Sequence, residues 1–401
     1  MKRKLLYPLA ALLLTTTFTS CDKEKEIEPT QPETESAFAR LLITDKSSTT
    51  VTLLDPAKSE QTSFQAGFGA SAVYPAGSGR FAAVVNGTNN LVEFFDTGIE
   101  AHDDHVHIKG TPKWALTRST APKPSHVAAS HNRFSIFNDG DATISYVDEG
   151  ELHTRSVPVT VQTGAAHHGA MLLFDNGNYA VTHKDNSVSG SLPERVKIVN
   201  TQGAVVAAPT LATKGIHGDA TDGKMALFGA PDGVLAISST GEQRLIPYPA
   251  GAGNNWLSTI YYASGAGTFL GSRAGYGVFR INPTTNTMTQ LGTAKTFVRV
   301  SLDAAGKNVL VLEENGQLTV FDAATGAEKV GRALIGLVAD VKAAGPYLAA
   351  SNRYVYLTNA PQGKVHMLDK ATLAEKQSFT VAGEPLRIAF VGADADSESG
   401  H

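Results

Sequence analysis

Histidine is concentrated in one stretch of this 401-residue chain, where ten of the twelve histidines lie between His102 and His217. Neutral imidazole is the commonest side-chain ligand for transition metals in proteins. The first group contains five candidate metal ligands within six residues: His102, Asp103, Asp104, His105 and His107. Imidazole and carboxylate suit zinc, and alternate residues of an extended chain face one side. We therefore expect His105 and His107 to share an ion on a mobile loop.

The second group consists of histidines that recur at the starts of successive repeated units: His126 in SHVAAS, His168 in HHGAMLLF and His217 in HGDATD. If the units form a ring, their first strands line a central channel and equivalent residues meet at one mouth. Three imidazoles at that mouth predict a zinc tripod. Water, Asp219 and Asp104 all remain candidates for its fourth ligand. Copper, nickel and cobalt also accept imidazole and carboxylate, so the metal identity stays open.

His167 directly precedes His168, and the alternation of side chains along a strand turns one of these two rings away from the channel. The sequence does not decide which ring faces inward, so both are candidate ligands. The two groups together suggest a carrier in which the loop 101–108 captures an ion and passes it to the channel mouth. A metal carrier needs ligands that can be exchanged, and exchangeable ligands are typical of an exposed site.

The elements that would position these residues are short β-strands. Apolar, β-rich runs alternate with turn signals such as Asn176-Gly177, Asp222-Gly223 and Asn315-Gly316, and no convincing helical period appears. The runs repeat about every 30 to 45 residues, which is typical of propeller blades. The sequence therefore predicts an all-β fold, a single β-propeller of eight blades, with seven as the alternative. The last unit is expected to start near Asp340, and the terminal run 386–391 to complete the first unit and close the ring.

The N-terminus predicts export and lipid attachment. Lys2, Arg3 and Lys4 precede an apolar run that is too short to span a membrane. Residues 1–20 are thus expected to be a lipoprotein signal peptide and Cys21, the only cysteine, to be acylated. Residues 21–37 are acidic and predict a disordered tether, residues 38–392 the propeller, and 393–401 a disordered tail. This order predicts a lipid-anchored protein of the bacterial cell envelope, facing the periplasm or the cell surface.

The charge balance bears on the class of partner. The formal net charge is −4, and removal of the three basic residues of the signal peptide leaves about −7. No basic stripe is visible, which excludes nucleic acid as a partner.

Three segments carry a resemblance to a known family: AHDDHVHI, GAAHHGAML and GIHGDATDGKMALFGAPDGVLAI. In this order and spacing they resemble the AztD-type periplasmic zinc metallochaperones, within the YVTN/WD40-like propeller superfamily. The resemblance implies a propeller that binds zinc without catalysis. It also implies a partner, the solute-binding protein of a zinc ABC transporter, to which the zinc is delivered.

Two other functions remain open at the level of sequence. One is a metal-dependent, lactonase-like hydrolase, which would need an open zinc position and a general base such as Asp219. No Gly-x-Ser-x-Gly or His-Glu-x-x-His motif accompanies it. The other is a propeller that binds a protein or glycan through aromatic residues such as Trp114 and Trp256, without a functional metal.

Overall fold

The computed structural model describes residues 35–102, 105–334 and 336–394. By its contacts the chain divides into Met1–Thr34 and a compact unit Glu35–His401, and everything described below belongs to the second. The predicted signal peptide, Cys21 and the tether as far as residue 34 lie outside the described residues. So do Asp103, Asp104 and residues 395–401 of the predicted tail.

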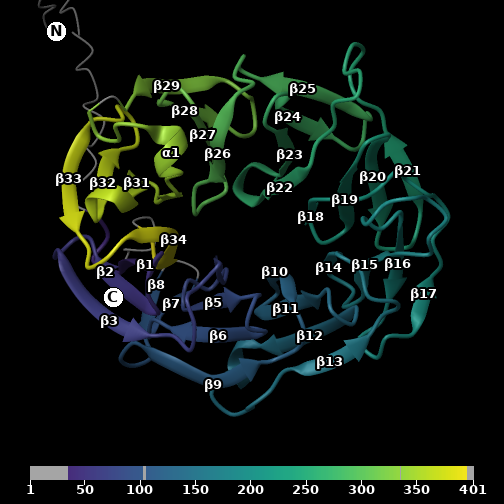
Figure 1. Ribbon diagram of the computed structural model, residues 1–401, viewed down its shortest axis with the longest axis horizontal. Coiled ribbons are helices and arrows are strands. Elements are labelled where there is room, and N and C mark those ends of the chain that lie inside the picture. The colour runs from purple at the N-terminus through teal and green to yellow at the C-terminus, as the bar shows by residue number, and fades with distance from the viewer. Residues whose placement is uncertain (1–34, 103–104, 335, 395–401) are drawn as a thin grey trace, which may run out of the picture. The chain divides into compact units, whose positions relative to one another are not determined.

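Eight four-stranded antiparallel sheets form a ring (Figure 1). We number these blades in chain order. Blade 1 contains β34 and β1–β3, blade 2 contains β4–β6 and β9, and blades 3 to 8 take four consecutive strands each from β10 to β33. The predicted all-β, eight-bladed propeller is confirmed, and the seven-blade alternative is wrong.

Each blade has the same order of strands from the channel outward. The innermost strands are, from blade 1 to blade 8, β34 (Pro385–Gly392), β4 (Ala72–Pro75), β10 (Pro124–Ser130), β14 (Met171–Leu173), β18 (Asp219–Thr221), β22 (Thr259–Ala263), β26 (Phe297–Leu302) and β30 (Leu348–Ala350). The second strands are β1 (Ala39–Asp45), β5 (Phe81–Asn86), β11 (Arg133–Asn138), β15 (Tyr179–His183), β19 (Met225–Ala230), β23 (Thr268–Arg273), β27 (Asn308–Glu313) and β31 (Tyr354–Asn359).

The outer half of each blade follows the same order. The third strands are β2 (Thr50–Asp55), β6 (Leu91–Asp96), β12 (Thr143–Asp148), β16 (Arg195–Val199), β20 (Gly233–Ser238), β24 (Gly277–Asn282), β28 (Gln317–Asp322) and β32 (Lys364–Asp369). The outermost strands are β3 (Glu60–Gln65), β9 (Lys113–Ser119), β13 (Val159–Gln162), β17 (Val205–Ala207), β21 (Gln243–Ile246), β25 (Thr287–Leu291), β29 (Glu328–Ala333) and β33 (Glu375–Thr380).

The remaining elements are small. They are the hairpin β7 (Ile99–His102) and β8 (His105–Ile108), the helix α1 (Val341–Ala344), and the single 3₁₀ turns η1 (Glu149–Glu151), η2 (Ser264–Ala266) and η3 (Ala360–Gln362). Among the described residues no helix is long and apolar enough to cross a membrane.

The apolar pattern explains why these strands stack as blades. Middle strands such as β5 and β31 are buried on both faces, whereas the outermost strands β3 and β29 are largely exposed. Strands covered on both faces are expected to be continuous apolar runs. Each blade accordingly packs a hydrophobic core against the next blade, and such cores follow one another around the whole ring.

The C-terminal strand closes the ring. β34 pairs with β1 in blade 1, with Leu41 opposite Phe390. The amide of Gly392 donates to the carbonyl of Gly79, 2.6 Å away, in the turn after β4 of blade 2. Gly79 has a φ of +71°, and a Cβ there would lie 1.8 Å from the Gly392 carbonyl oxygen. The predicted closure by 386–391 is therefore confirmed, and a glycine is required where the two ends of the ring meet.

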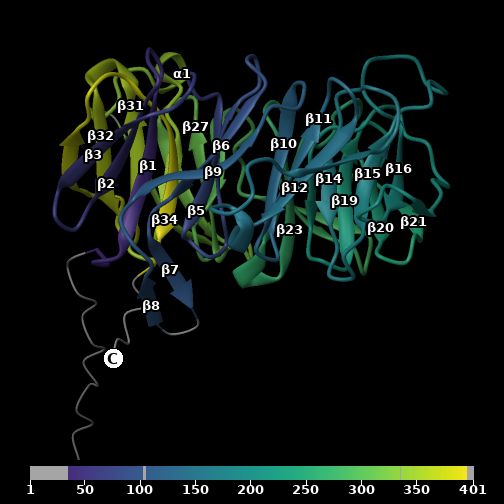
Figure 2. The ribbon, with the colours of Figure 1, turned by 90° about the horizontal axis from the view of Figure 1, so that it is seen from below.

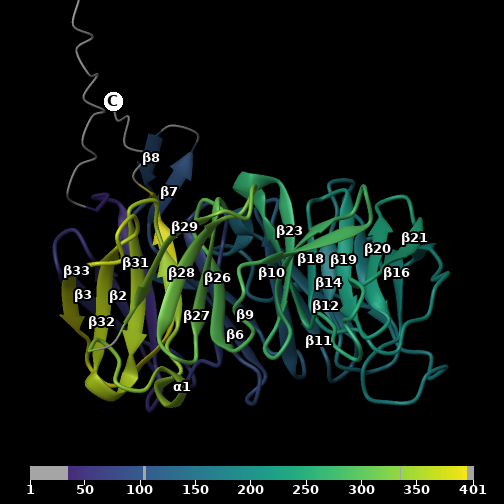
Figure 3. The same ribbon diagram turned by 90° about the horizontal axis from the view of Figure 1, so that it is seen from above.

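The innermost strands all run the same way through the ring, because every blade repeats the same order. We call the face where they begin the start face, and the opposite one the hairpin face. Helix α1 directly precedes β30 and lies on the start face (Figure 3). The hairpin β7–β8 follows the end of β6 and projects from the opposite side of the ring (Figure 2).

Two residues near predicted boundaries have defined roles in the fold. Glu35, in the segment predicted to be a tether, is buried and accepts hydrogen bonds from Ser351 and Tyr356, each at 2.6 Å. Two hydroxyl donors offset the cost of burying this carboxylate, which an acidic stretch of sequence does not reveal. Asp340 does not start a strand, since it caps α1 by accepting from the Ala343 amide at 2.9 Å.

Candidate metal site at the start face

Three histidines from three successive blades meet at the start face. His126 is the third residue of β10, whereas His168 and His217 lie in the segments that lead into β14 and β18. Their ring centroids are 5.3 Å apart for His126 and His168, 5.5 Å for His168 and His217, and 6.3 Å for His126 and His217. The structure thus brings together the three residues that the repeat pattern aligned, although two of them precede their strands.

The spacing of the rings can be compared with that of a zinc site. Tetrahedral zinc with Zn–N bonds of about 2.0 Å holds imidazole centroids about 5 Å apart. Two of the three separations are close to this value and the third is wider. Within residues 35–102, 105–334 and 336–394, no three His, Cys, Asp or Glu side chains form a ready-made metal site. The three rings are therefore an open set that would have to draw inward to hold an ion.

The Nδ1 atoms of all three rings are already engaged. Each faces an oxygen that only accepts hydrogen bonds, so each Nδ1 carries the proton and each Nε2 keeps a lone pair. Metal-binding histidines usually have this arrangement, in which the second nitrogen donates to a carboxylate or carbonyl that fixes the ring. The bonds are His126 to Asp219 Oδ1 at 3.2 Å, His168 to Asp139 Oδ2 at 2.7 Å and His217 to the Ser258 carbonyl at 2.8 Å.

Two carboxylates therefore orient the histidines. Asp219, a candidate fourth ligand from the sequence, hydrogen-bonds to His126 instead. Asp139 lies in the turn between β11 and β12, which places it beside His168. No sequence pattern marked it as a partner, since its role depends on the neighbouring blade.

Burial and charge act oppositely on these groups. Burial favours the neutral ring of His126, but the hydrogen bond and charge of Asp219 outweigh it and raise the pKa of His126. Burial alone would raise the pKa of Asp139, but hydrogen bonds from His168 and Ser125 hold it below its ordinary value. Asp139 thus stays ionised beside His168.

His167 and His168 have different surroundings. His167 is only 7% exposed, and both of its nitrogens are bonded, Nδ1 to the Ala165 carbonyl at 2.7 Å and Nε2 to Thr182 Oγ1 at 2.9 Å. Burial lowers its pKa. His168 faces the other two histidines, so His167 is a buried hydrogen-bonding residue of blade 4 with no nitrogen left for a metal.

A cavity of about 260 Å³ adjoins His126 and His217. Tyr74 of blade 2, His126, His217, Asp219 and Ser258 contribute to its walls. An ion held by the three Nε2 atoms would therefore have room for a water or an incoming ligand in a fourth position.

The first group of candidate ligands lies elsewhere. Residues 99–102 and 105–108 form the paired strands β7 and β8 rather than a loop, with His102 opposite His105 and Glu100 opposite His107. The hairpin is on the hairpin face (Figure 2), at the other end of the channel from the three histidines. His107 is exposed, and Asp103 and Asp104 lie outside the described residues. The described strands of the hairpin do not contribute to the start-face cluster.

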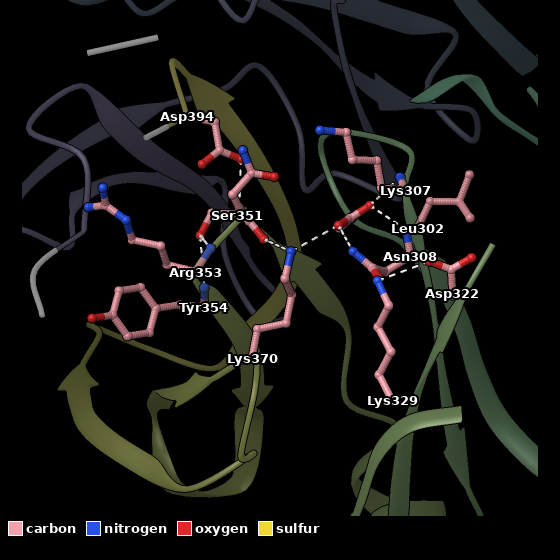
Figure 4. Close-up of polar contacts among 12 residues, drawn as sticks. Leu302, Lys307, Asn308, Asp322, Lys329, Ser351, Arg353, Tyr354, Lys370 and Asp394 are labelled. Carbon is pink, nitrogen blue, oxygen red and sulfur yellow. Dashed lines mark hydrogen bonds and ion pairs between the residues drawn. The ribbon is translucent and has the colours of Figure 1, made fainter. Parts of the chain in front are cut away.

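A larger cavity of about 460 Å³ lies at the hairpin face, lined by Ala101, Asp303 and Asp394 among mostly small apolar residues. Asp303 accepts hydrogen bonds from Lys370 at 2.9 Å and from Asn308 at 2.6 Å, and Figure 4 labels these two donors. The contact with Lys370 joins blade 7 to blade 8, so Asp303 stabilises a blade interface and is already paired with a cation.

Comparisons with known proteins agree with the propeller fold. No family model matches the chain. Zinc chaperone AztD of Citrobacter koseri is 24% identical over 385 residues, covering 90% of this chain and 88% of that protein. The crystal structure of C. koseri AztD matches with a TM-score of 0.79 at 22% identity, over 90% of this chain and 99% of the other. Its apo structure has the same TM-score and identity, over 89% and 100%.

A more distant match is the dihydro-heme d1 dehydrogenase NirN, with a TM-score of 0.61 at 13% identity, over 92% of this chain and 78% of that one. The resemblance to AztD that the three histidine-bearing segments predicted is thus confirmed, and it extends over nearly the whole chain.

Proposed function

We propose that this protein is a zinc chaperone of the bacterial envelope. It holds one zinc ion at the start face through Nε2 of His126, His168 and His217 and delivers it to the solute-binding protein of a zinc transporter. The observation that carries the proposal is the shared tautomer of the three rings, whose Nδ1 atoms are fixed by Asp219, Asp139 and a backbone carbonyl. The similarity to zinc chaperone AztD supports the same reading.

The exposure of the site suits delivery. The His126 side chain is 26% and the His168 side chain 40% exposed, so a partner's ligand can reach an ion that they hold. A site of three protein ligands and one exchangeable position lets an incoming ligand bind before the first histidine leaves. Asp219, the candidate base of a hydrolase, is engaged with His126, and no observation favours hydrolysis over carriage.

The decisive measurement is zinc titration of the chain 22–401 in competition with a chelator of known affinity. His126→Ala, His168→Ala and His217→Ala are each expected to weaken zinc binding by at least about tenfold, equivalent to 1.4 kcal/mol. Asp139→Asn, which leaves all three ligands in place, is expected to weaken it by about 10- to 100-fold. Binding no tighter than micromolar in the unaltered chain would contradict the proposal.

The matched control is His131→Ala. His131 is exposed and bonds through Nε2 to Asp175 at 2.8 Å, away from the other rings, so its loss should leave zinc affinity unchanged. Delivery is tested by mixing the zinc-loaded chain with the organism's own zinc-binding transporter protein and separating the two. Zinc that stays on the propeller at equilibrium with that protein would argue for storage instead.

Attachment to the envelope completes the proposal. Acylation of Cys21 would hold the propeller at a membrane through the acidic segment that follows it. Labelling of cells with a fatty-acid analogue should mark the wild-type chain and not Cys21→Ser. Equal labelling of both would remove the lipid anchor from the proposal.

A further inference from the structure

Two arginines stack on one tyrosine at the start face, on the other side of the ring from the histidines. Arg299 is the third residue of β26 in blade 7, Arg387 the third residue of β34 in blade 1, and Tyr347 directly precedes β30 in blade 8. The guanidinium carbons of Arg299 and Arg387 lie 3.5 Å and 4.1 Å from the centroid of the Tyr347 ring. Three successive blades thus bring two positive charges together at the channel mouth.

Both arginine positions resemble that of His126, which is the third residue of β10. At each of the three positions the pairing of the innermost strand with the second strand shifts register, between Pro124 and His126, between Phe297 and Arg299, and beside Arg387 in the pairing of β34 with β1. Such irregularities re-aim a side chain. The propeller therefore uses the same strand position for a histidine on one side and for arginines on the other.

Neither arginine has a carboxylate partner within the described residues. The Nε of Arg299 donates to the Pro346 carbonyl at 3.2 Å. The Nε of Arg387 is buried and has no hydrogen-bond partner in the described protein. Arg80 and Arg133 differ, since Arg80 contacts Asp96 at 2.9 Å and Arg133 contacts Asp148 at 2.6 Å.

The two charges are close enough to act on each other. Burial lowers the pKa of Arg387, and the charge of Arg299 lowers it further. Burial also lowers the pKa of Arg299. Stacking on an aromatic face offsets part of such a cost, but it supplies no negative charge. An arrangement that keeps two partly buried cations unpaired is one that an anion would stabilise.

The group is held in place before any ligand arrives. The amide of Tyr347 donates to the hydroxyl of Thr358 at 2.8 Å, and that hydroxyl donates to the carbonyl of Leu386, the neighbour of Arg387, at 3.1 Å. One threonine thereby connects the tyrosine of blade 8 to the arginine of blade 1. Fixed groups lose little entropy on binding a ligand.

We infer that Arg299, Arg387 and Tyr347 form an anion-binding site at the channel mouth, which takes a carboxylate or phosphate group. A planar guanidinium offers paired N–H donors to either oxyanion, and both guanidinium groups are held against the one tyrosine ring. The site stands apart from the proposed zinc chemistry, because it lies on blades 7, 8 and 1, whereas the histidines lie on blades 3 to 5.

The test uses metal-free chain 22–401 at low ionic strength, titrated separately with inorganic phosphate and with succinate by calorimetry. At least one of the two is expected to bind in the millimolar range or tighter. Arg387→Gln and Arg299→Gln should each weaken binding by about tenfold or more, and Arg387→Lys, which keeps the charge but loses the planar fork, should fall between. The preferred probe identifies the class of anion.

Arg332→Gln is the matched control, since it removes an equal charge from an exposed position on β29. Its binding should equal that of the unaltered chain. Absence of binding of both probes to the unaltered chain overturns the inference, as does binding that persists in the Arg299→Gln, Arg387→Gln double variant. Because no metal is present, these outcomes are independent of whether the histidines bind zinc.

Discussion

At the scale of single residues, carboxylates near histidines divide into two uses. Asp139 and Asp219 hold rings whose other nitrogen faces the channel mouth. Asp96 instead stabilises the fold. It accepts hydrogen bonds from Nε and Nη2 of Arg80, each at 2.9 Å, and from His153 at 2.7 Å. The residue types are the same, so only the three-dimensional structure distinguishes a carboxylate that orients a histidine ring from one that stabilises the fold.

Asp96 gives a prediction on acid stability. Burial alone would raise its pKa, but Arg80, His153 and the Gly98 amide outweigh burial and lower it. The stabilisation is therefore fully present above the unfolded value of about 4 and lost as the pH falls through the folded pKa. Asp96→Asn should lower the free energy of unfolding by about 3 kcal/mol at neutral pH, and by less below pH ~4.

Urea denaturation at several pH values measures this difference. Asp148→Asn is the control, because Asp148 also pairs with an arginine but is 47% exposed, and it should cost less than about 1 kcal/mol. A difference for Asp96→Asn that stays constant from neutral to acidic pH would contradict the assignment.

Much of the candidate site was predictable at this scale, because His126, His168 and His217 recur at equivalent places in the repeat. The choice of His168 over His167 was not. It depends on Thr182 and the Ala165 carbonyl, which bind both nitrogens of His167. The arginines opposite were missed, since two isolated arginines about 90 residues apart form no local pattern.

At the scale of elements, the hairpin β7–β8 is an addition to blade 2 between its third and outermost strands. The sequence correctly indicated a segment rich in His and Asp outside the regular repeat. It predicted a loop beside the channel site, because a linear chain does not show at which face an insertion emerges. The direction of β6 places it on the hairpin face.

Removal of the hairpin tests this placement. Ile99 and Ile108 are directly paired, so residues 100–107 can be replaced by an Asn-Gly turn, which suits a two-residue hairpin connection. The thermal midpoint and the zinc affinity of the start-face site should both stay unchanged. If the hairpin binds its own ion, only the total zinc stoichiometry falls. A loss of start-face affinity would show that the hairpin supplies it with a ligand.

At the scale of the whole molecule, the ring depends on one seam, where the last strand joins the first blade. Blade number and closure were predictable because repeat spacing is visible along the chain and an unmatched strand was left at the end. The burial of Glu35 beside Ser351 and Tyr356 was not predictable from the sequence. That contact joins residues more than 300 positions apart in the chain.

Two glycines of one turn test the seam. Gly79→Ala places a Cβ against the Gly392 carbonyl at a positive φ, and should lower the free energy of unfolding by more than about 1 kcal/mol. Gly77→Ala, in the same turn, meets no atom within 4 Å and should be nearly neutral. Chemical denaturation compares the two. Equal effects would mean that closure tolerates a side chain at Gly79.

The apolar contacts between neighbouring blades run around the ring without using the three channel histidines. Small zinc domains collapse when the ion is removed, because the ion is their core. Here the apolar cores do not include an ion, so under the proposed function an emptied molecule would keep its shape and could be reloaded. Each round of transfer would then involve only the exchange of ligands, and the same copy could serve many rounds without refolding.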